Sequence, residues 1–111
     1  MGDFKDKVVV VTGGAHGIGK CIVEMFRAEG AHVCTIDLRE NDYFVGNLAK
    51  KDTLERFAEK VLADYGHVDF LINNALPLMK GIDECSYEEF IYAQQVGVVA
   101  PFYLAKLFKE H

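Results

Sequence analysis

The stretch that decides the fold is VVVVTGGAHGIGKCIVEMF, residues 8–26. A run of four valines ends in a threonine, four glycines follow within seven residues, and apolar residues with helical spacing come after them. Glycine at a strand-to-helix junction lets the backbone approach a ligand, and the start of the helix offers free N–H groups and the positive end of its dipole. The stretch therefore predicts an anion site, most often one for phosphate.

The glycine spacing excludes two common phosphate-binding motifs. From Thr12 the sequence has the pattern T-G-x-x-x-G-I-G, with Gly13, Gly17 and Gly19 as the spaced glycines, and not G-x-G-x-x-G. No Gly-Lys-Ser/Thr follows, so a P-loop is excluded as well. Taken alone, the cluster could equally be a glycine-rich turn without a ligand, and the residues after it are needed to choose.

The composition indicates one globular domain over residues 1–111. Of the residues, 50% are hydrophobic and 26% charged, the net charge is −5, and no apolar run is long enough to span a bilayer. We therefore expect neither a nucleic-acid nor a membrane partner. The three cysteines and four histidines have no metal-ligand spacing, so we expect no metal, reduced thiols and a cytoplasmic location.

Strand and helix patterns alternate along the chain. Short apolar runs predict strands at residues 7–12, 31–36, 43–45 and 68–72. Helical spacing predicts one helix ending at Gly30 and another ending at Gly66. Ser86 and Glu89 form a capping box for a third helix, and Pro101 should kink that helix or start a new one. This alternation predicts the α/β class, with a Rossmann-like, doubly wound parallel sheet covered by helices on both faces.

Asp37 closes the second predicted strand, eighteen residues after Gly19. In a doubly wound sheet an acid at that place can accept hydrogen bonds from the ribose hydroxyls of adenosine and repels the 2′-phosphate of NADP. An aspartate that only ends a strand in a turn is the alternative. The glycine turn and the strand–helix–strand frame around it favour the ribose role.

Three features together resemble the short-chain dehydrogenase/reductase family: the sequence TGGAHGIG, Asp37 after the second strand, and INNA at residues 72–75. The resemblance covers the whole chain and implies the strand order 3-2-1-4. In that family the glycine turn holds the pyrophosphate of a dinucleotide. The implied contacts in this sequence are Gly13, Ala15, His16, Gly17, Ile18 and Gly19.

The same resemblance implies NAD as the cofactor. Many members that use NADP have Arg or Lys at the place of His16, so His16 agrees with Asp37 in favouring NAD. Arg39 lies close to Asp37 and could soften that preference. Leu38 completes the implied adenosine contacts at the end of the second strand.

Two further segments match the family with changes. The family usually has Asp-Val after the third strand, touching adenine, where this sequence has Asn47 and Leu48. An asparagine carbonyl can still accept a hydrogen bond from the adenine amino group. Asn74 and Ala75 match the family's Asn-Ala step beside the cofactor ribose, but residues 76–77 are Leu-Pro where the family usually has glycine.

The family's proton-transfer residues are not found in these 111 residues. Gly97 occupies the position of the catalytic asparagine and could keep only the role of its main-chain carbonyl. The catalytic serine and the Tyr-x-x-x-Lys pair of the family lie after the point that corresponds to His111. We therefore expect no catalytic residue here, and a chain that is inactive on its own.

The resemblance thus implies the NAD-binding part of an oxidoreductase that transfers hydride between nicotinamide and a small-molecule alcohol or carbonyl substrate. A non-catalytic dinucleotide-binding module and a fragment that needs a complementary chain both remain open. In the implied strand order residues 68–72 form an apolar sheet edge, which invites pairing with another chain. We therefore expect a homo-oligomer or a complementary chain as partner.

Overall fold

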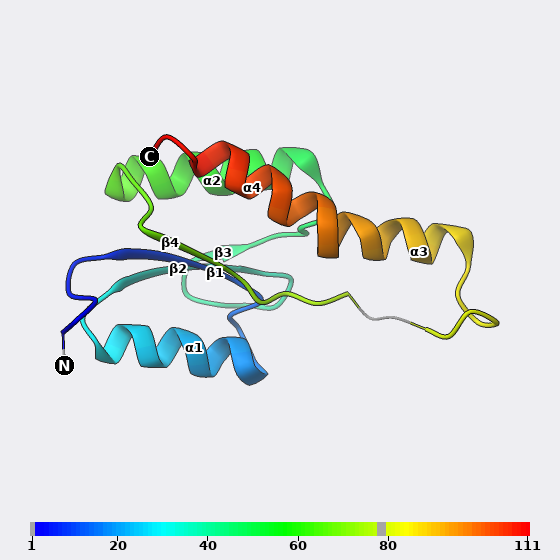
Figure 1. Cartoon of the computed structure of the whole chain (residues 1–111), viewed down its shortest axis with the longest axis horizontal. Helices are drawn as coiled ribbons and strands as arrows, with labels where there is room; N and C mark the ends of the chain where they lie inside the picture. The colour runs from blue at the N-terminus through cyan, green and yellow to red at the C-terminus, as the bar shows by residue number, and fades with distance from the viewer. Residues whose placement is uncertain (1, 78–79) are drawn as a thin grey trace.

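The computed structural model describes residues 2–77 and 80–111, and its centre is a four-stranded parallel sheet (Figure 1). The strands are β1 (Val8–Thr12), β2 (His32–Asp37), β3 (Phe44–Val45) and β4 (Phe70–Asn73). The helices are α1 (Gly17–Ala28), α2 (Lys51–Tyr65), α3 (Tyr87–Gln94), the π-helix η1 (Gln95–Val99) and α4 (Ala100–Phe108). The strand order is β3-β2-β1-β4, so the predicted class and topology are confirmed.

The valine run forms β1, which lies between two parallel neighbours. Val10 is in register with Cys34 of β2 on one side and with Leu71 of β4 on the other. All five β1 residues are buried, as expected for a strand covered on both faces. Each fully buried valine side chain contributes about 1.5–3 kcal/mol of hydrophobic free energy relative to an exposed one. The run therefore fixes the centre of the fold.

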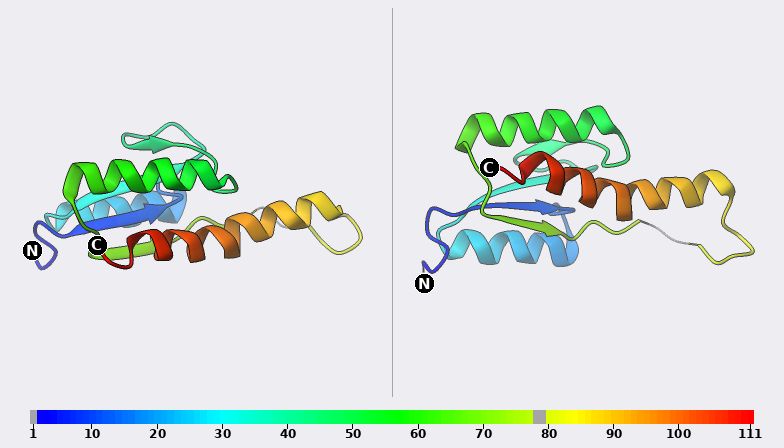
Figure 2. Two further views of the ribbon diagram at one scale, coloured as in Figure 1. Left: turned by 90° about the horizontal axis from the view of Figure 1, so that it is seen from above. Right: turned by 45° about the horizontal axis from the view of Figure 1, so that its top comes forward.

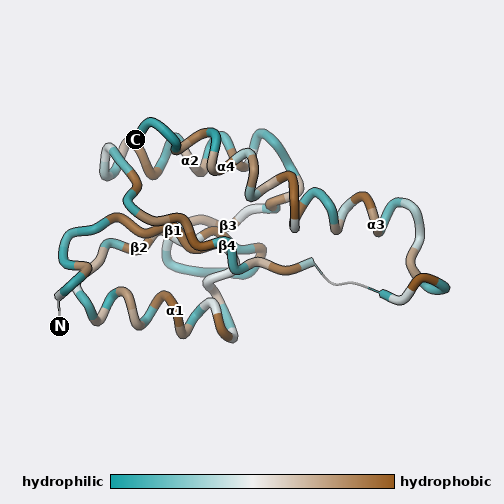
Figure 3. Tube along the Cα trace, viewed as in Figure 1, coloured by the Kyte–Doolittle hydropathy of each residue, from teal (hydrophilic) through white to brown (hydrophobic). Residues whose placement is uncertain are grey.

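Alternate valines of β1 face two separate cores. Val9 and Val11 point to the side of α1, where they pack with Val23. Val8 and Val10 point to the opposite side, which α2 and α4 cover together (Figures 1 and 2). Figure 3 shows β1 as a nearly continuous hydrophobic segment. Phe57 of α2 is fully buried in this second core.

The fourth strand begins later than its sequence predicts. Val68 donates its N–H to the carbonyl of His111 and so lies outside the ladder, and β4 runs from Phe70 to Asn73. Asp69 accepts a hydrogen bond from the N–H of Val8 at 2.8 Å, which ties the entry of β4 to that of β1. Phe70 is 41% exposed, because in the described part of the chain β4 pairs with β1 alone.

The C-terminal helical segment contains a feature that the sequence did not predict. The capping box is confirmed, because Ser86 and Glu89 exchange side-chain-to-backbone hydrogen bonds at the start of α3. Pro101 was expected either to kink the third helix or to start a new one. It lies in the first turn of α4, so it starts a new helix. The unexpected element is η1, which joins α3 to α4. In Figures 1 and 2, α3 projects beyond the sheet.

Two smaller expectations are also met. The second helix ends at Gly66, which has the left-handed φ of 81° that favours glycine at a helix C-terminus. Cys34 is a buried free thiol, and its burial raises its pKa to about 11.

Within residues 2–77 and 80–111, no helix has the length and apolar character needed to cross a bilayer.

Candidate functional site

The glycine turn connects β1 to α1, and its glycines are needed for different reasons. A Cβ on Gly14 would overlap the side chain of Thr35, whose hydroxyl accepts the Gly14 N–H at 3.1 Å and donates to the Val11 carbonyl at 2.9 Å. A Cβ on Gly19 would overlap the carbonyl oxygen of Gly13. Both positions therefore require glycine for internal packing.

Gly17 is different. A Cβ built there would meet no atom within 4 Å, and φ is +58°, in the left-handed region. The residue is therefore free of packing constraints and faces open space at the first position of α1. Open space in front of a helix N-terminus is what a bound anion needs.

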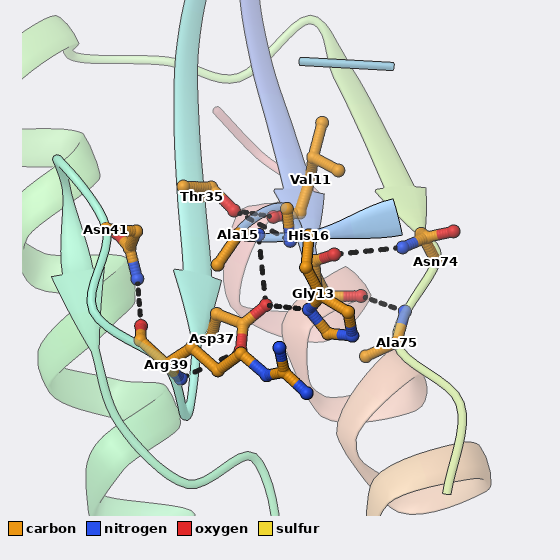
Figure 4. A network of polar contacts seen from close by, with 12 residues as sticks. Val11, Gly13, Ala15, His16, Thr35, Asp37, Arg39, Asn41, Asn74 and Ala75 are labelled. Carbon is orange, nitrogen blue, oxygen red and sulfur yellow. Dashed lines mark hydrogen bonds and ion pairs between the residues drawn. The ribbon is translucent and has the colours of Figure 1, made fainter. Parts of the chain in front are cut away.

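Two residues after β4 hold the turn in place (Figure 4). The side-chain amide of Asn74 donates to the carbonyl of Gly13 at 3.1 Å, and the N–H of Ala75 donates to the Thr12 hydroxyl at 3.0 Å. These bonds join the carboxyl ends of β1 and β4. The expectation for Asn74 was a place beside a cofactor ribose, and the structure adds that its amide group binds the glycine turn.

Asp37 is the central polar group of the site, and only 6% of it is exposed. One carboxylate oxygen accepts the N–H of Ala15 at 3.0 Å, and the other accepts the N–H of Arg39 at 2.9 Å. The imidazole Nδ1 of His16 lies 3.7 Å from the carboxylate (Figure 4). Each carboxylate oxygen has two acceptor sites, so both can accept a further hydrogen bond. Asp37 thus fixes the turn and still faces the cleft.

These groups border a cleft of about 520 Å³, a size typical of small-molecule sites. The turn and β2 contribute one wall. All predicted cofactor residues except Ala15 belong to its lining, which includes Leu38, Asn47, Leu48, Asn74 and Ala75. Ala15 instead offers its N–H to Asp37. The structure therefore brings together residues that lie as far apart in the sequence as Gly13 and Ala75.

The sequence did not identify several residues of the opposite wall. Tyr92 of α3 donates its hydroxyl hydrogen to the side-chain oxygen of Asn47 at 3.2 Å, and the same oxygen accepts the N–H of Ala49 at 2.9 Å. The oxygen expected to meet adenine thus already has two donors. No local pattern could pair Tyr92 with Asn47, because the contact is purely tertiary. Leu76, Pro77 and Val96 also line the cleft, as does Gly46, whose N–H donates to the carbonyl of Asp37 at 2.9 Å.

The electrostatics at the start of α1 suit an anion. The first turn contains no acidic residue, and the side chain of the N-cap residue His16 makes no capping hydrogen bond. The amides of that turn and the helix dipole therefore point at the cleft without an internal anion to satisfy them. In the part of the chain that the structure describes, no group of three or more potential ligands could hold a metal ion.

Curated relatives match this chain over almost its whole length. An uncharacterized oxidoreductase of Thermotoga maritima is 33% identical over 94% of this chain and 47% of its own length. An L-fucose dehydrogenase of Mus musculus is 30% identical over 97% of this chain and 45% of its own. An NAD-dependent glycerol dehydrogenase of Listeria innocua is 28% identical over 95% and 47%. The chain thus spans about half the length of the curated relatives it matches.

Solved structures match the fold of the chain as well. An apo SCOR enzyme of Clostridium thermocellum has a TM-score of 0.85 and 37% identity, over 95% of this chain and 48% of that one. L-sorbose reductase of Gluconobacter frateurii, solved with NADPH and L-sorbose, has a TM-score of 0.85 and 26% identity, over 96% and 48%. The family model for short chain dehydrogenases matches residues 7–111. With its glycine turn, its Asp37 and its strand order in place, the chain belongs to the short-chain dehydrogenase/reductase family.

Proposed function

We propose that the protein is an NAD(H)-dependent oxidoreductase that acts on the CH–OH group of small-molecule alcohols or on the corresponding carbonyls. In this proposal the present chain supplies the dinucleotide cleft. The observation that carries it is the buried Asp37 carboxylate, anchored by Ala15 and Arg39 and facing a cleft that begins at a helix N-terminus. Relatives named as glycerol and L-fucose dehydrogenases support the substrate class.

The chain's residues fit a dinucleotide along the whole cleft. The open space in front of Gly17 and the free amides of the first turn of α1 suit the pyrophosphate. The acceptor capacity left on Asp37 suits two ribose hydroxyls. Leu38 and Leu48 offer apolar contact for adenine on the same side. When bound, the nicotinamide would supply the hydride chemistry.

The preference for NAD over NADP follows from charge. A 2′-phosphate would have to lie against the Asp37 carboxylate, and repulsion between like charges at close range costs several kcal/mol. His16 and Arg39 are the cationic or potentially cationic side chains in the lining near Asp37. They would lessen that repulsion without removing it. L-sorbose reductase, one of the similar solved structures, contains NADPH. The affinities of this chain for NADH and for NADPH therefore need to be compared directly.

The direct test of the activity is an assay of this chain with the complementary segment of the family added, using NAD and a panel of polyols, sugars and simple alcohols, in which the formation of NADH is followed by its absorbance. We expect NADH formation with at least one polyol or sugar. Tight binding of NADH with no turnover on the whole panel would instead favour the second candidate function, a dinucleotide-binding module without catalysis. Gly97, at the position of the family's catalytic asparagine, favours that candidate.

We also propose that the edge of β4 is covered in solution by a second copy or by a complementary chain, in the cytoplasm. Phe70 on β4 and Phe102 on α4 are 41% and 65% exposed, and an apolar edge with free backbone groups invites pairing. Three cysteines without disulfide partners agree with a reducing compartment. Sedimentation equilibrium on the 111-residue chain should show association. A cooperatively melting monomer at tens of micromolar would contradict it.

A further inference from the structure

The side-chain oxygen of Asn47 is fully occupied by donors of the protein itself. It accepts the N–H of Ala49 at 2.9 Å and the hydroxyl hydrogen of Tyr92 at 3.2 Å. A backbone N–H can only donate, so the atom that meets Ala49 must be the oxygen and not the amide nitrogen. An amide oxygen has two lone pairs, and both are used here. This oxygen is therefore closed to a ligand.

The amide nitrogen of Asn47 is in the opposite situation. In the described part of the chain Nδ2 has no hydrogen-bond partner, although no buried side-chain nitrogen or oxygen there is left without one. Nδ2 is therefore accessible, on a residue that lines the cleft. An amide nitrogen carries two hydrogens and no acceptor site. Asn47 thus offers a ligand a donor and no acceptor.

This polarity decides which edge of a purine the side chain can bind. The exocyclic amino group of adenine is a donor, whereas an oxo group at the same ring position is an acceptor. An amino group gains no hydrogen bond from Nδ2, because both groups donate. Hypoxanthine, which has an oxo group in place of the amino group of adenine, can accept from Nδ2.

The hydroxyl of Tyr92 is the group that closes the oxygen. Ala49 is two residues from Asn47 in the same turn, so its N–H takes one lone pair within a local structure. The second donor comes from α3, 45 positions along the chain. Tyr92 also lines the cleft. Without its hydroxyl, the second lone pair of the oxygen would be open to a ligand.

We propose that Tyr92 is a positioning residue that sets how the cleft recognises a purine: its hydroxyl occupies the oxygen of Asn47 and leaves the Nδ2 donor for the base. The chain then does not select for the amino group of adenine. This inference rests on the proposed function, because it takes the ligand to be a dinucleotide whose base meets Asn47. It replaces the expectation that the oxygen of Asn47 accepts from that amino group.

The test compares NADH with reduced nicotinamide hypoxanthine dinucleotide, in which an oxo group replaces the adenine amino group. Titration calorimetry on the purified protein gives both dissociation constants, and their ratio is the readout. A loss of stability that weakens both ligands equally leaves this ratio unchanged. We expect the parent to bind the hypoxanthine ligand at least as tightly as NADH, or no more than about threefold less tightly.

Two variants should restore selection for adenine. Tyr92→Phe removes only the hydroxyl and frees one lone pair of Asn47, which should shift the ratio about threefold toward NADH, the size of one net hydrogen bond. Asn47→Asp keeps an acceptor for Ala49 and puts a carboxylate oxygen in place of the donor. It should shift the ratio toward NADH at least about tenfold, because hydrogen bonds to charged groups are stronger.

Tyr87→Phe is the matched control, because Tyr87 also lies on α3, is 74% exposed and is not part of the cleft lining. Its ratio should equal that of the parent. A melting curve for each variant shows whether it is folded. If Tyr92→Phe folds poorly, Asn47→Asp decides the test alone.

A parent that binds NADH more than about threefold more tightly than the hypoxanthine ligand would overturn the inference. An unchanged ratio in folded Tyr92→Phe would overturn it as well. A shift of that ratio toward the hypoxanthine ligand would also do so, since the Tyr92 oxygen itself would then accept from the amino group. A parent that binds neither ligand would instead overturn the proposed function.

Discussion

The two walls of the cleft are built in different ways. The wall made by the glycine turn is local: Gly14 and Gly19 pack against Thr35 and Gly13, and few atoms could be added there. The opposite wall depends on tertiary contacts, such as the hydrogen bond from the Tyr92 hydroxyl to the side-chain oxygen of Asn47. The first wall is therefore fixed by local packing, whereas the second depends on how distant segments of the chain are placed against each other.

The largest expected effect comes from breaking the local wall. In Gly19→Ala the new methyl group would overlap the Gly13 carbonyl and the Asn74 amide, so the turn and its link to β4 cannot both persist. Overpacking of this kind costs about 1–3 kcal/mol, and we expect the upper end because backbone is involved. Urea denaturation measures the change. Gly81→Ala, in open space, is the control and should leave the free energy of unfolding nearly unchanged.

A variant with the parent's stability would show that the turn can relax around a methyl group. In that case the glycine turn would not be fixed by its local packing, and it would not differ in this respect from the opposite wall of the cleft. Gly19 would then be exchangeable, and the internal packing of the turn would not explain its glycines.

The second prediction separates folding from binding within the same turn. Gly17 has open space around it but a left-handed φ, so asparagine, which tolerates this conformation, is a better probe than valine. We expect Gly17→Asn to fold like the parent but to weaken NADH binding at least tenfold (about 1.4 kcal/mol), because its side chain would enter the space of the pyrophosphate. Calorimetry and a melting curve give the two quantities separately.

Parent-like NADH affinity in a well-folded Gly17→Asn would make the turn structural only. A melting temperature far below that of the parent would point to a packing role that the open surroundings of Gly17 do not suggest. Substitution of Gly19 is therefore expected to lower the stability of the fold, whereas substitution of Gly17, two positions away, is expected to lower the affinity for NADH alone.

The same contrast explains how much could be predicted from the sequence. The capping box at Ser86 and the end of α2 at Gly66 follow from local patterns, the strand order follows from the family resemblance, and the structure confirms all three. The start of β4 was wrong by two residues, because the N–H of Val68 binds the carbonyl of His111 and not a strand.

The remaining part of the site depends on contacts that no local pattern encodes. Tyr92 and Asn47 are 45 positions apart, and Val96 lines the cleft only because η1 lies beside it. The π-helix itself has no sequence signature of the kind that caps and turns have. Composition and spacing could therefore predict one wall of the cleft but not the other.

The smallest expected effect lies at the far end of β4, away from both walls. The hydrogen bond from the N–H of Val8 holds the pKa of Asp69 below its usual value, so its stabilising effect is present at neutral pH and is lost as pH falls below about 4. Because the side chain is partly exposed, we expect Asp69→Asn to cost less than about 1 kcal/mol at pH 7.

Urea denaturation of both proteins between about pH 7 and pH 3 tests the sign, since protonated aspartic acid resembles asparagine. The difference in the free energy of unfolding should shrink as pH falls, and NADH affinity at neutral pH should not change. A difference that is constant over this range would mean that the carboxylate charge contributes nothing.

The central claim is that the Asp37 end of the cleft binds the ribose of NAD. Calorimetric titration of the purified protein with NADH and NADPH, and of Asp37→Ala with the same ligands, tests it most directly. Asp37→Asn, which keeps the shape of the side chain without its charge, is the matched control for lost anchoring of Ala15 and Arg39. We expect the parent to bind NADH at least about tenfold more tightly than NADPH, and both variants to narrow this gap. Equal dissociation constants for the two cofactors in the parent would contradict the assignment of Asp37.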